Sequence, residues 1–286
     1  MNRLIVALFV AALPLGQVAM AQSTSPTLAR IKAAGAINIA YSPDSVPFSF
    51  TENNGTPMGY SVDLCKRVVA QVGRAVGQPN LKVNWIAAST PQRLQMVASG
   101  KADLDCANTT QTLARHANVD FSGLIFLDTG GFIGRADAPV ARMADMNGKK
   151  IAVLKGTTTE ARLRDVLQKR LVNAEVVTID GASDGIAKLE SGAVDLYAGD
   201  RIKLLGLVTQ AQDPSKFILL TEEISYEPYA LALPRNDSGM RLEVNRALSQ
   251  VYRGGEIESI YGVWFGKLGR PSNLLGAMYL LYSIPD

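Results

Sequence analysis

The spacing of apolar residues along the chain predicts an alternation of strands and helices. Between 59 and 76, apolar residues recur every three or four positions and predict an amphipathic helix; they are Val62, Cys65, Val69, Val72 and Val76. Thr90 and Pro91 are typical of a helix start, as N-cap and first helical residue, and Gly100 of a helix end. Strands are predicted around these helices, at 37–40, 81–86 and 102–106. A βαβαβ unit implies a parallel sheet that is covered by helices.

A second unit of this kind follows, with strands predicted at 150–154 and 175–179 and helices from 157 and at 182–190. The two units share one junction, because Ser-Gly-x-(Ala/Val)-Asp-Leu occurs at 99–104 and again at 191–196. A polar residue follows nine positions after each serine, Asn108 in the first unit and Asp200 in the second. A Ser-Gly pair can simply end a helix, but the matched offset favours two lobes of similar plan.

The remaining elements complete an α/β protein. A strand is predicted at 225–234, followed by helices at 241–254 and 257–265. If this tail returns to the first lobe, the chain crosses between the lobes twice, and two extended crossings form a hinge. Ligands bind beyond the carboxyl ends of parallel strands, so two facing lobes predict a ligand cleft between them. We expect lobe 1 to comprise 22–129 and 226–286, and lobe 2 to comprise 130–225.

The first 21 residues are typical of a secretory signal peptide. Arg3 supplies a positive charge, an apolar stretch runs from Leu4 to Leu15, and Ala19-Met20-Ala21 fits a signal peptidase site. The apolar stretch is shorter than the roughly 20 residues that a membrane-spanning helix needs. We therefore expect cleavage after Ala21 and export into an oxidising compartment. The apolar segment 274–284 is also too short to span a membrane, and we expect it to pack on lobe 1 rather than to contact a partner.

Composition limits the chemistry that the chain can perform. Apolar residues make up 47% of the 286 residues, which supports a sizeable folded core. The formal net charge of +3 is close to neutral and gives no reason to expect a nucleic-acid partner. One histidine, His116, and two cysteines are too few for a conventional zinc site, so neither a metal nor a cofactor is expected.

Four short motifs follow one another along the chain. They are SVPFSF at 45–50, GYSVDL at 59–64, DCANTT at 105–110 with Arg115 shortly after, and KGTT at 155–158. In this order they resemble the periplasmic solute-binding proteins of ABC importers, specifically solute-binding protein family 3, the polar amino acid branch. The Cys-x-x-Thr-Thr stretch at 106–110 resembles the glutamate/aspartate-binding members. The resemblance implies a type II periplasmic binding protein fold and a periplasmic monomer that delivers an amino acid to an inner-membrane ABC permease.

The two charges of an amino acid zwitterion match residues at these motifs. An arginine offers a planar pair of donors to the α-carboxylate, and a helix start offers backbone N–H groups to the same anion. A carboxylate at a strand end suits the α-ammonium. The expected contacts are Arg115, Gly156, Thr157 and Thr158 for the carboxylate, Asp200 for the ammonium, and Asn108 and Thr110 for neutral hydrogen bonds.

Several of these residues also have a simpler interpretation. Arg115 could be a solvated loop residue, Thr157 only a helix cap, and Asp200 half of a surface pair with its neighbour Arg201. Phe48 is expected either as an aromatic wall of the pocket or as a core residue. Both interpretations stay open for each residue at this point.

The positions that would meet the ligand side chain depart from the acidic amino acid binders. Those proteins place a basic residue after the first strand and a histidine in the second lobe, and Ser42 and Ala182 stand at these positions here. Arg93, near a predicted helix start, could meet an anionic side chain or be a solvated helix residue. The resemblance thus implies a retained grip on the α-groups and a weakened grip on an acidic side chain. Glutamate and a neutral or other small amino acid both remain open as ligands.

The two cysteines are expected to form a disulfide. Cys65 lies on the apolar stripe of the first helix, and Cys106 alternates with Leu104 along a strand, so both thiols face one helix–sheet interface. Secretion permits the bond. Two buried free thiols are the alternative.

An enzyme on the same scaffold is the competing function. The resemblance extends to periplasmic cyclohexadienyl dehydratases, which would need a catalytic acid in the cleft. Glu160 and Glu227 are the candidates, but a capping box explains Glu160 and a hinge loop explains Glu227. His116 directly follows Arg115, so its side chain points elsewhere. We therefore predict a binding protein with no catalytic residues.

Overall fold

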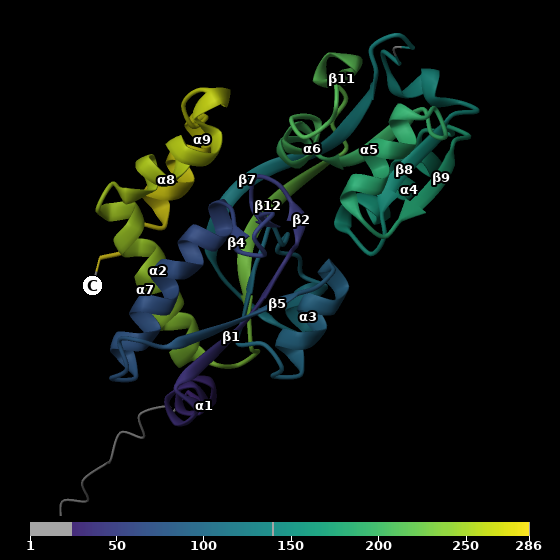
Figure 1. Ribbon diagram of the computed structural model, residues 1–286. Helices are drawn as coiled ribbons and strands as arrows, with labels where there is room; N and C mark the ends of the chain where they lie inside the picture. Colours follow the sequence, from purple (N-terminus) through teal and green to yellow (C-terminus); the bar gives the residue numbers. More distant parts are fainter. Residues whose placement is uncertain (1–24, 139, 286) are drawn as a thin grey trace, which may run out of the picture.

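The computed structural model describes residues 25–138 and 140–285 (Figure 1). The predicted signal peptide, 1–21, lies outside these residues. One long mixed sheet, in the strand order β5-β1-β6-β12-β7-β10-β8-β9, runs through the molecule, and β11 pairs with β7. A small antiparallel sheet lies beside it and contains β2 (Asp44–Ser45), β3 (Ser49–Thr51) and β4 (Pro57–Met58).

Two groups of parallel strands occupy opposite ends of the long sheet. The first group contains β1 (Ala36–Tyr41), β5 (Lys82–Ala87) and β6 (Leu104–Cys106). The second group contains β8 (Lys150–Leu154), β9 (Glu175–Ile179) and β10 (Leu196–Asp200). We call the part built on the first group lobe 1 and the part built on the second group lobe 2. Each predicted strand is confirmed to within two residues.

Two long antiparallel strands connect the lobes. β7 (Asp120–Arg135) and β12 (Ser225–Leu233) pair from Leu233 and Asp120 at one end to Ser225 and Gly130 at the other. Figure 1 shows both strands running from the part around β1 and β5 to the part around β8 and β9. The two predicted crossings are therefore present as neighbouring strands of one sheet. β7 was not predicted, and the short strand β11 (Phe217–Leu219) extends its pairing in lobe 2.

Helices cover both faces of each strand group. Lobe 1 carries α1 (Pro26–Ala34), α2 (Tyr60–Ala75), α3 (Thr90–Ala98), α7 (Ser238–Arg253), α8 (Glu256–Phe265) and α9 (Asn273–Leu281). Lobe 2 carries α4 (Thr158–Lys169), α5 (Ala182–Glu190) and α6 (Arg201–Val208). Short 3-10 turns lie at 115–117, 143–146, 214–216 and 266–268. None of the helices in the described ranges is long and apolar enough to span a membrane.

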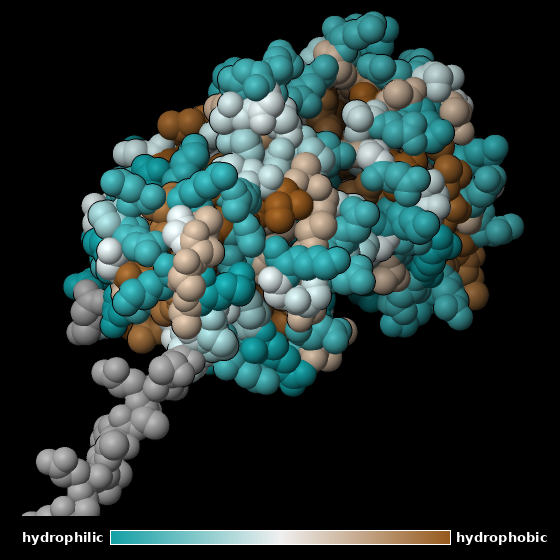
Figure 2. Space-filling view, turned by 60° about the horizontal axis from the view of Figure 1, so that its bottom comes forward, coloured by the Kyte–Doolittle hydropathy of each residue, from teal (hydrophilic) through white to brown (hydrophobic). Residues whose placement is uncertain are grey.

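The hydrophobic residues form separate cores in the two lobes. The largest core joins α2, α7, α8 and α9 to the lobe 1 strands, and a smaller one lies under α3. In lobe 2, one core lies under α4 and another under α5 and α6. On the face shown in Figure 2, apolar side chains form separate patches on a mainly hydrophilic surface. Each lobe therefore has hydrophobic cores of its own, and the largest of them includes residues of the connecting strands.

A disulfide joins helix and sheet in lobe 1, as predicted. Cys65 on α2 and Cys106 on β6 are bonded, with their Cα atoms 6.2 Å apart. Both side chains lie in the core because they come from the buried faces of their elements. The bond fixes the strand that leads directly into the predicted ligand loop.

The apolar C-terminal segment packs on lobe 1, which confirms that expectation. Leu275, Met278 and Tyr279 of α9 are buried in the large core, and the Tyr279 hydroxyl lies 2.9 Å from the Tyr60 hydroxyl. The opposite face of the helix, with Leu280 and Leu281, is exposed.

Candidate ligand-binding site

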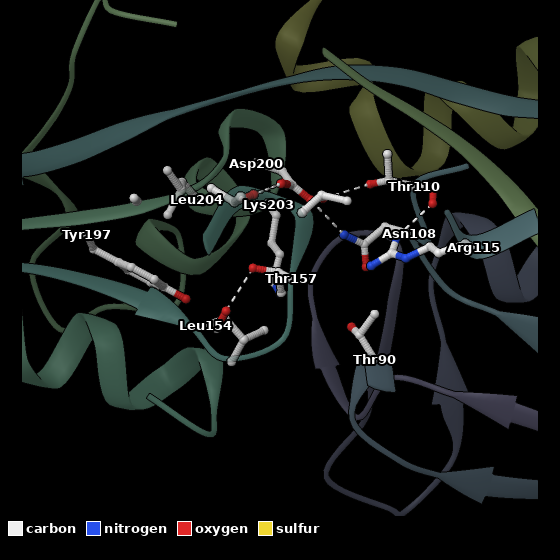
Figure 3. A pocket seen from close by; sticks show the side chains of 14 residues that line it. Thr90, Asn108, Thr110, Arg115, Leu154, Thr157, Tyr197, Asp200, Lys203 and Leu204 are labelled. Atoms are coloured by element: carbon white, nitrogen blue, oxygen red, sulfur yellow. Dashed lines mark hydrogen bonds between the residues drawn. The ribbon is translucent and has the colours of Figure 1, made fainter. Parts of the chain in front are cut away.

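A pocket lies between the lobes, at the carboxyl ends of β6, β8 and β10 (Figure 3). The cavity itself is about 30 Å³, and about 470 Å³ of empty space, open solvent included, lies among the lining atoms. Lobe 1 contributes Thr90, Asn108, Thr110 and Arg115; lobe 2 contributes Leu154, Thr157, Thr158, Thr159, Tyr197, Ala198, Gly199, Asp200, Lys203 and Leu204. The structure thus brings together six of the predicted contacts: Asn108, Thr110, Arg115, Thr157, Thr158 and Asp200.

Arg115 lies half-buried at the lobe 1 side of the pocket. It opens a 3-10 turn, and its Nη1 donates to the Thr110 carbonyl oxygen over 2.6 Å. Within the described ranges no carboxylate forms an ion pair with it. Burial lowers the pKa of Arg115, and the acids Asp105, Glu227 and Asp200 oppose that shift. The guanidinium is therefore held in place by the backbone while most of its donors stay available to an anion.

The start of α4 faces Arg115 from lobe 2. The Thr157 Oγ1 caps the helix by accepting from the Glu160 N–H over 3.2 Å. The next two N–H groups, on Thr158 and Thr159, begin the helix and have no partner within it. Thr157 is thus a helix cap, as its simpler interpretation required, and the uncapped N–H groups beside it give the pocket a second anion-binding element.

Gly156 does not line the pocket. Its φ of 72° is one that glycine tolerates best, and a Cβ here would lie 2.5 Å from Cγ of Pro91 in lobe 1. The predicted ligand contact is therefore corrected. The residue is a turn glycine that lets the two lobes approach each other.

Asp200 ends β10 and is largely buried. One carboxylate oxygen accepts from the Thr159 hydroxyl over 2.8 Å. The other accepts from the Asn108 amide over 3.1 Å and from the Tyr229 hydroxyl over 2.6 Å. Its neighbour Arg201 instead lies 3.7 Å from Glu223, which removes the surface-pair interpretation. Donors from both lobes therefore orient the carboxylate at the pocket (Figure 3).

Two further carboxyl groups lie beneath the pocket on the connecting strands. Glu227 on β12 accepts from the hydroxyls of Ser225, Thr110 and Thr158 over 2.5, 2.5 and 2.8 Å. Burial raises the pKa of Glu227, and the charge of Asp200 raises it further. Its assignment to a hinge loop was wrong, because it stands inside a strand. The hinge strand thus bridges the lobes through one buried carboxyl group.

Asp128 on β7 forms the second of these groups. It accepts from the Ile202 and Thr129 N–H groups over 3.1 and 2.8 Å and from the Tyr229 hydroxyl over 3.3 Å. Burial raises its pKa well above the usual range, and the nearby Asp200 adds to the shift. Sequence reasoning missed Asp128, although an acid within a long apolar strand was a usable signal.

Phe48 belongs to the core rather than to the pocket wall. Its side chain is fully buried, and its ring packs against Phe126, Tyr229 and Phe265 with centroids 5.0, 5.2 and 5.4 Å away. Complete burial among other rings stabilises an aromatic side chain more than partial exposure to water in a cleft does. The predicted contact is therefore corrected in favour of its alternative.

Arg93 is neither solvated nor free to meet a ligand. Its side chain is buried, and its Nε lies 2.8 Å from Asp105 Oδ1. The remaining donors reach the Ala88 carbonyl and the hydroxyls of Thr90 and Thr109. Both interpretations of Arg93 were wrong, because Asp105 compensates its charge inside lobe 1.

Ser42 also lies outside the pocket and takes part in a contact between the lobes. Its hydroxyl donates to Asp44 Oδ1 over 3.2 Å, and Asp44 Oδ2 accepts from the Ala182 N–H of α5 over 2.8 Å. Ser42 and Ala182 are thus connected through the Asp44 carboxylate.

Lys203 is a pocket residue that sequence reasoning missed. It lies on α6, beside Asp200, and its side chain is largely buried (Figure 3). Burial lowers its pKa, while Asp44 and Asp200 raise it. A lone lysine in the otherwise apolar run of α6 was the signal that could have found it.

Comparisons with known proteins agree with this fold. The family model described as bacterial extracellular solute-binding proteins, family 3, matches residues 37–267. The L-glutamate/L-aspartate-binding protein of Pseudomonas aeruginosa is 29% identical over 89% of this chain and 85% of its own length. The glutamate/aspartate import solute-binding protein of Salmonella typhimurium is 27% identical over 89% of this chain and 84% of its own. An ancestral arginine-binding protein bound to glutamine superposes with a TM-score of 0.72 and 27% identity, over 81% of this chain and 98% of that one.

A two-lobed α/β scaffold with a pocket that presents opposite charges defines a solute-binding protein of the type II periplasmic fold. The chain belongs to the bacterial extracellular solute-binding proteins, family 3. The named relatives are binding proteins for solute import, and this chain is a binding protein of that kind rather than an enzyme.

Proposed function

We propose that this protein binds an amino acid as a zwitterion in the pocket between its lobes. The observation that supports this most directly is the pair Arg115 and Asp200, which lie on opposite lobes of one pocket. Arg115 and the start of α4 hold the α-carboxylate, and Asp200 holds the α-ammonium. Thr110 and Asn108 complete the hydrogen bonding at the two ends.

Ligand binding favours the closed arrangement of the lobes. We take lobe 1 as 22–129 and 226–286 and lobe 2 as 130–225, so that β7 and β12 form the hinge. Direct contacts between the lobes include polar ones, such as Asn108 to Asp200 and Asp44 to Ala182. A zwitterion that contacts both lobes adds bonds that exist only when they meet, and it therefore shifts the population toward closure.

The biological role follows from closure. A cleaved signal peptide at 1–21 delivers the protein to the periplasm, where it acts as a monomer. The closed, loaded form then presents its two lobes to an inner-membrane ABC permease, which receives the amino acid. The disulfide between Cys65 and Cys106 is compatible with that oxidising location.

Calorimetric titration with the twenty amino acids tests the proposal. We expect at least one amino acid to bind to the wild-type protein. Arg115→Ala should weaken that binding about 100-fold, because a bidentate charged contact to the carboxylate is lost. Arg142→Ala is the matched control, since Arg142 is exposed and lies outside the pocket. Equal affinities for Arg115→Ala and the control would contradict the role of Arg115.

A further inference from the structure

Lys203 brings a positively charged side chain to the pocket, and most of that side chain is buried. The residue is only 8% exposed. Within the described part of the chain it forms neither a hydrogen bond nor an ion pair, and Asp44 and Asp200 act on it only through space. Figure 3 shows its side chain among the pocket residues, between those of lobe 2 and those of lobe 1. The side chain is largely buried, and an ammonium that has no protein partner gains most from an anion that enters the pocket.

The neighbouring acids are already engaged by other donors. The Asp200 oxygens accept from Thr159, Asn108 and Tyr229. The two oxygens of Asp44 accept from the Ser42 hydroxyl and from the backbone at the start of α5. Neither carboxylate is turned to Lys203 within ion-pair distance.

The other cations near the pocket leave this role to Lys203. Arg115 serves the α-carboxylate in the proposed function, and Arg93 is paired with Asp105 inside lobe 1. Among the residues that line the pocket, Arg115 and Lys203 are the two cations. A second anionic group in the pocket would therefore meet Lys203.

We propose that Lys203 is a specificity-determining residue that binds an anionic group at the end of the ligand side chain. The ligand class is then an amino acid with an acidic side chain. Its α-carboxylate meets Arg115, its α-ammonium meets Asp200, and its second acid meets Lys203, so that three ligand charges find three opposite charges. A neutral side chain would leave the ammonium buried and unpaired when the lobes close. This inference rests on the proposed function and adds the chemistry of the side chain to it.

Isosteric ligand pairs test the inference with the wild-type protein alone. L-Glutamate is compared with L-glutamine, and L-aspartate with L-asparagine, by calorimetric titration at pH 7.5. We expect the acid of at least one pair to bind about 10- to 100-fold more tightly than its amide. If amino acids bind but no acid is preferred over its amide, the Lys203 inference is overturned and the proposed function stands. If no amino acid binds, the proposed function itself fails.

Substitution of Lys203 then assigns the preference to this residue. In Lys203→Met, which keeps the length of the side chain, the ratio of amide to acid dissociation constants should fall about 10- to 100-fold. Lys188→Met is the matched control, because Lys188 lies on the neighbouring helix α5 outside the pocket, and its ratio should equal the wild-type value. A wild-type ratio in Lys203→Met would overturn the proposal.

The melting temperature without ligand separates recognition from a structural role. Because the ammonium has no partner in the described structure, Lys203→Met should melt at or above the wild-type temperature in the absence of amino acids. A marked decrease would show that Lys203 holds the fold together, and this result would also overturn the proposal. Lys203→Gln provides the same comparison with a polar side chain.

Discussion

Both lobes have the same hydrogen-bonded junction at the start of their last parallel strand. They differ at the end of that strand. Asp103 before β6 exchanges hydrogen bonds with the Asn38 backbone of β1, and both are 2.7 Å long. Asp195 before β10 makes the same pair of contacts with the Lys150 backbone of β8, both 2.8 Å long. The shared Ser-Gly-x-(Ala/Val)-Asp-Leu junction thus serves the scaffold, by joining a helix end to the neighbouring strand.

At the ligand side the lobes differ in charge. The strand-end residue is the neutral Asn108 in lobe 1 and the anionic Asp200 in lobe 2, and the two are hydrogen-bonded over 3.1 Å. The cations that follow are Arg115 in a short turn and Lys203 in a helix. The scaffold residues bond to the backbone and can be repeated, whereas in the proposed function the pocket residues meet a ligand with unlike ends and must differ.

The disulfide is a covalent link that lobe 1 has and lobe 2 lacks. It closes a loop between positions 41 residues apart in lobe 1, and both cysteines of the chain are used there. We expect the variant Cys65→Ala with Cys106→Ala to lose about 3–4 kcal/mol of unfolding free energy. Hydrogen exchange should show reduced protection at α2 and β6 and unchanged protection at α4 and β8. Equal loss in both lobes would show that they unfold as one unit.

Substitution at the two strand ends tests whether the charge difference matters for binding. Asp200→Asn should weaken amino acid binding about 100-fold, because it removes the charge that meets the α-ammonium. Asn108→Ala should cost about 10-fold or less, since it removes a neutral hydrogen bond. Calorimetry measures both, and Asp195→Asn, which lies at the other end of the same strand, is the control for lobe 2. A larger loss of affinity in Asn108→Ala than in Asp200→Asn would contradict the importance of the charge at the lobe 2 strand end.

The buried acid of the hinge should make stability depend on pH. Asp128 has a pKa raised well above 3.8 in the folded protein, mainly by burial. The folded state therefore binds more protons than the unfolded chain above the unfolded pKa, and the unfolding free energy falls as the pH rises until Asp128 is ionised in both states. As the pH rises above the unfolded pKa, the melting temperature of Asp128→Asn should decline less steeply than that of the wild type.

A pH series of melting curves without ligand checks this smallest effect. Asp137→Asn is the control, because Asp137 is exposed on a loop, and its curve should follow the wild type. A decline in Asp128→Asn as steep as that of the wild type would place the proton uptake elsewhere, with Glu227 as the next carboxyl group to test.

Local sequence patterns were sufficient to predict helices and strands and two of the residues that line the pocket. Apolar periodicity located α2, and the capping signature located the start of α4. The position of a residue at the end of a parallel strand placed Asn108 and Asp200 at the pocket. These inferences succeed because they depend on contacts between residues close in sequence or on a general rule of sheet topology.

Residues whose surroundings come from distant segments were predicted less well. Arg93 was expected at a surface or a ligand, but Asp105, from another element, takes its charge inside lobe 1. Phe48 was expected either in the pocket wall or in the core. Aromatic rings from β7, β12 and α8 surround it in the core. Lys203 was passed over because a lysine in a helix is usually solvated, whereas the fold buries most of this one.

The sequence by itself determined the alternation of strands and helices and the family, and it predicted the disulfide and most of the proposed contacts to a zwitterion. These follow from side-chain periodicity, capping chemistry and the order of motifs. Only the tertiary structure decided which charges are compensated within the protein and which remain for a ligand. Arg93 and Lys203 are both basic residues in helices near the pocket, and their difference lies in one buried carboxylate at 2.8 Å from Arg93. The distance between two segments remote in sequence is set by the packing of the whole chain.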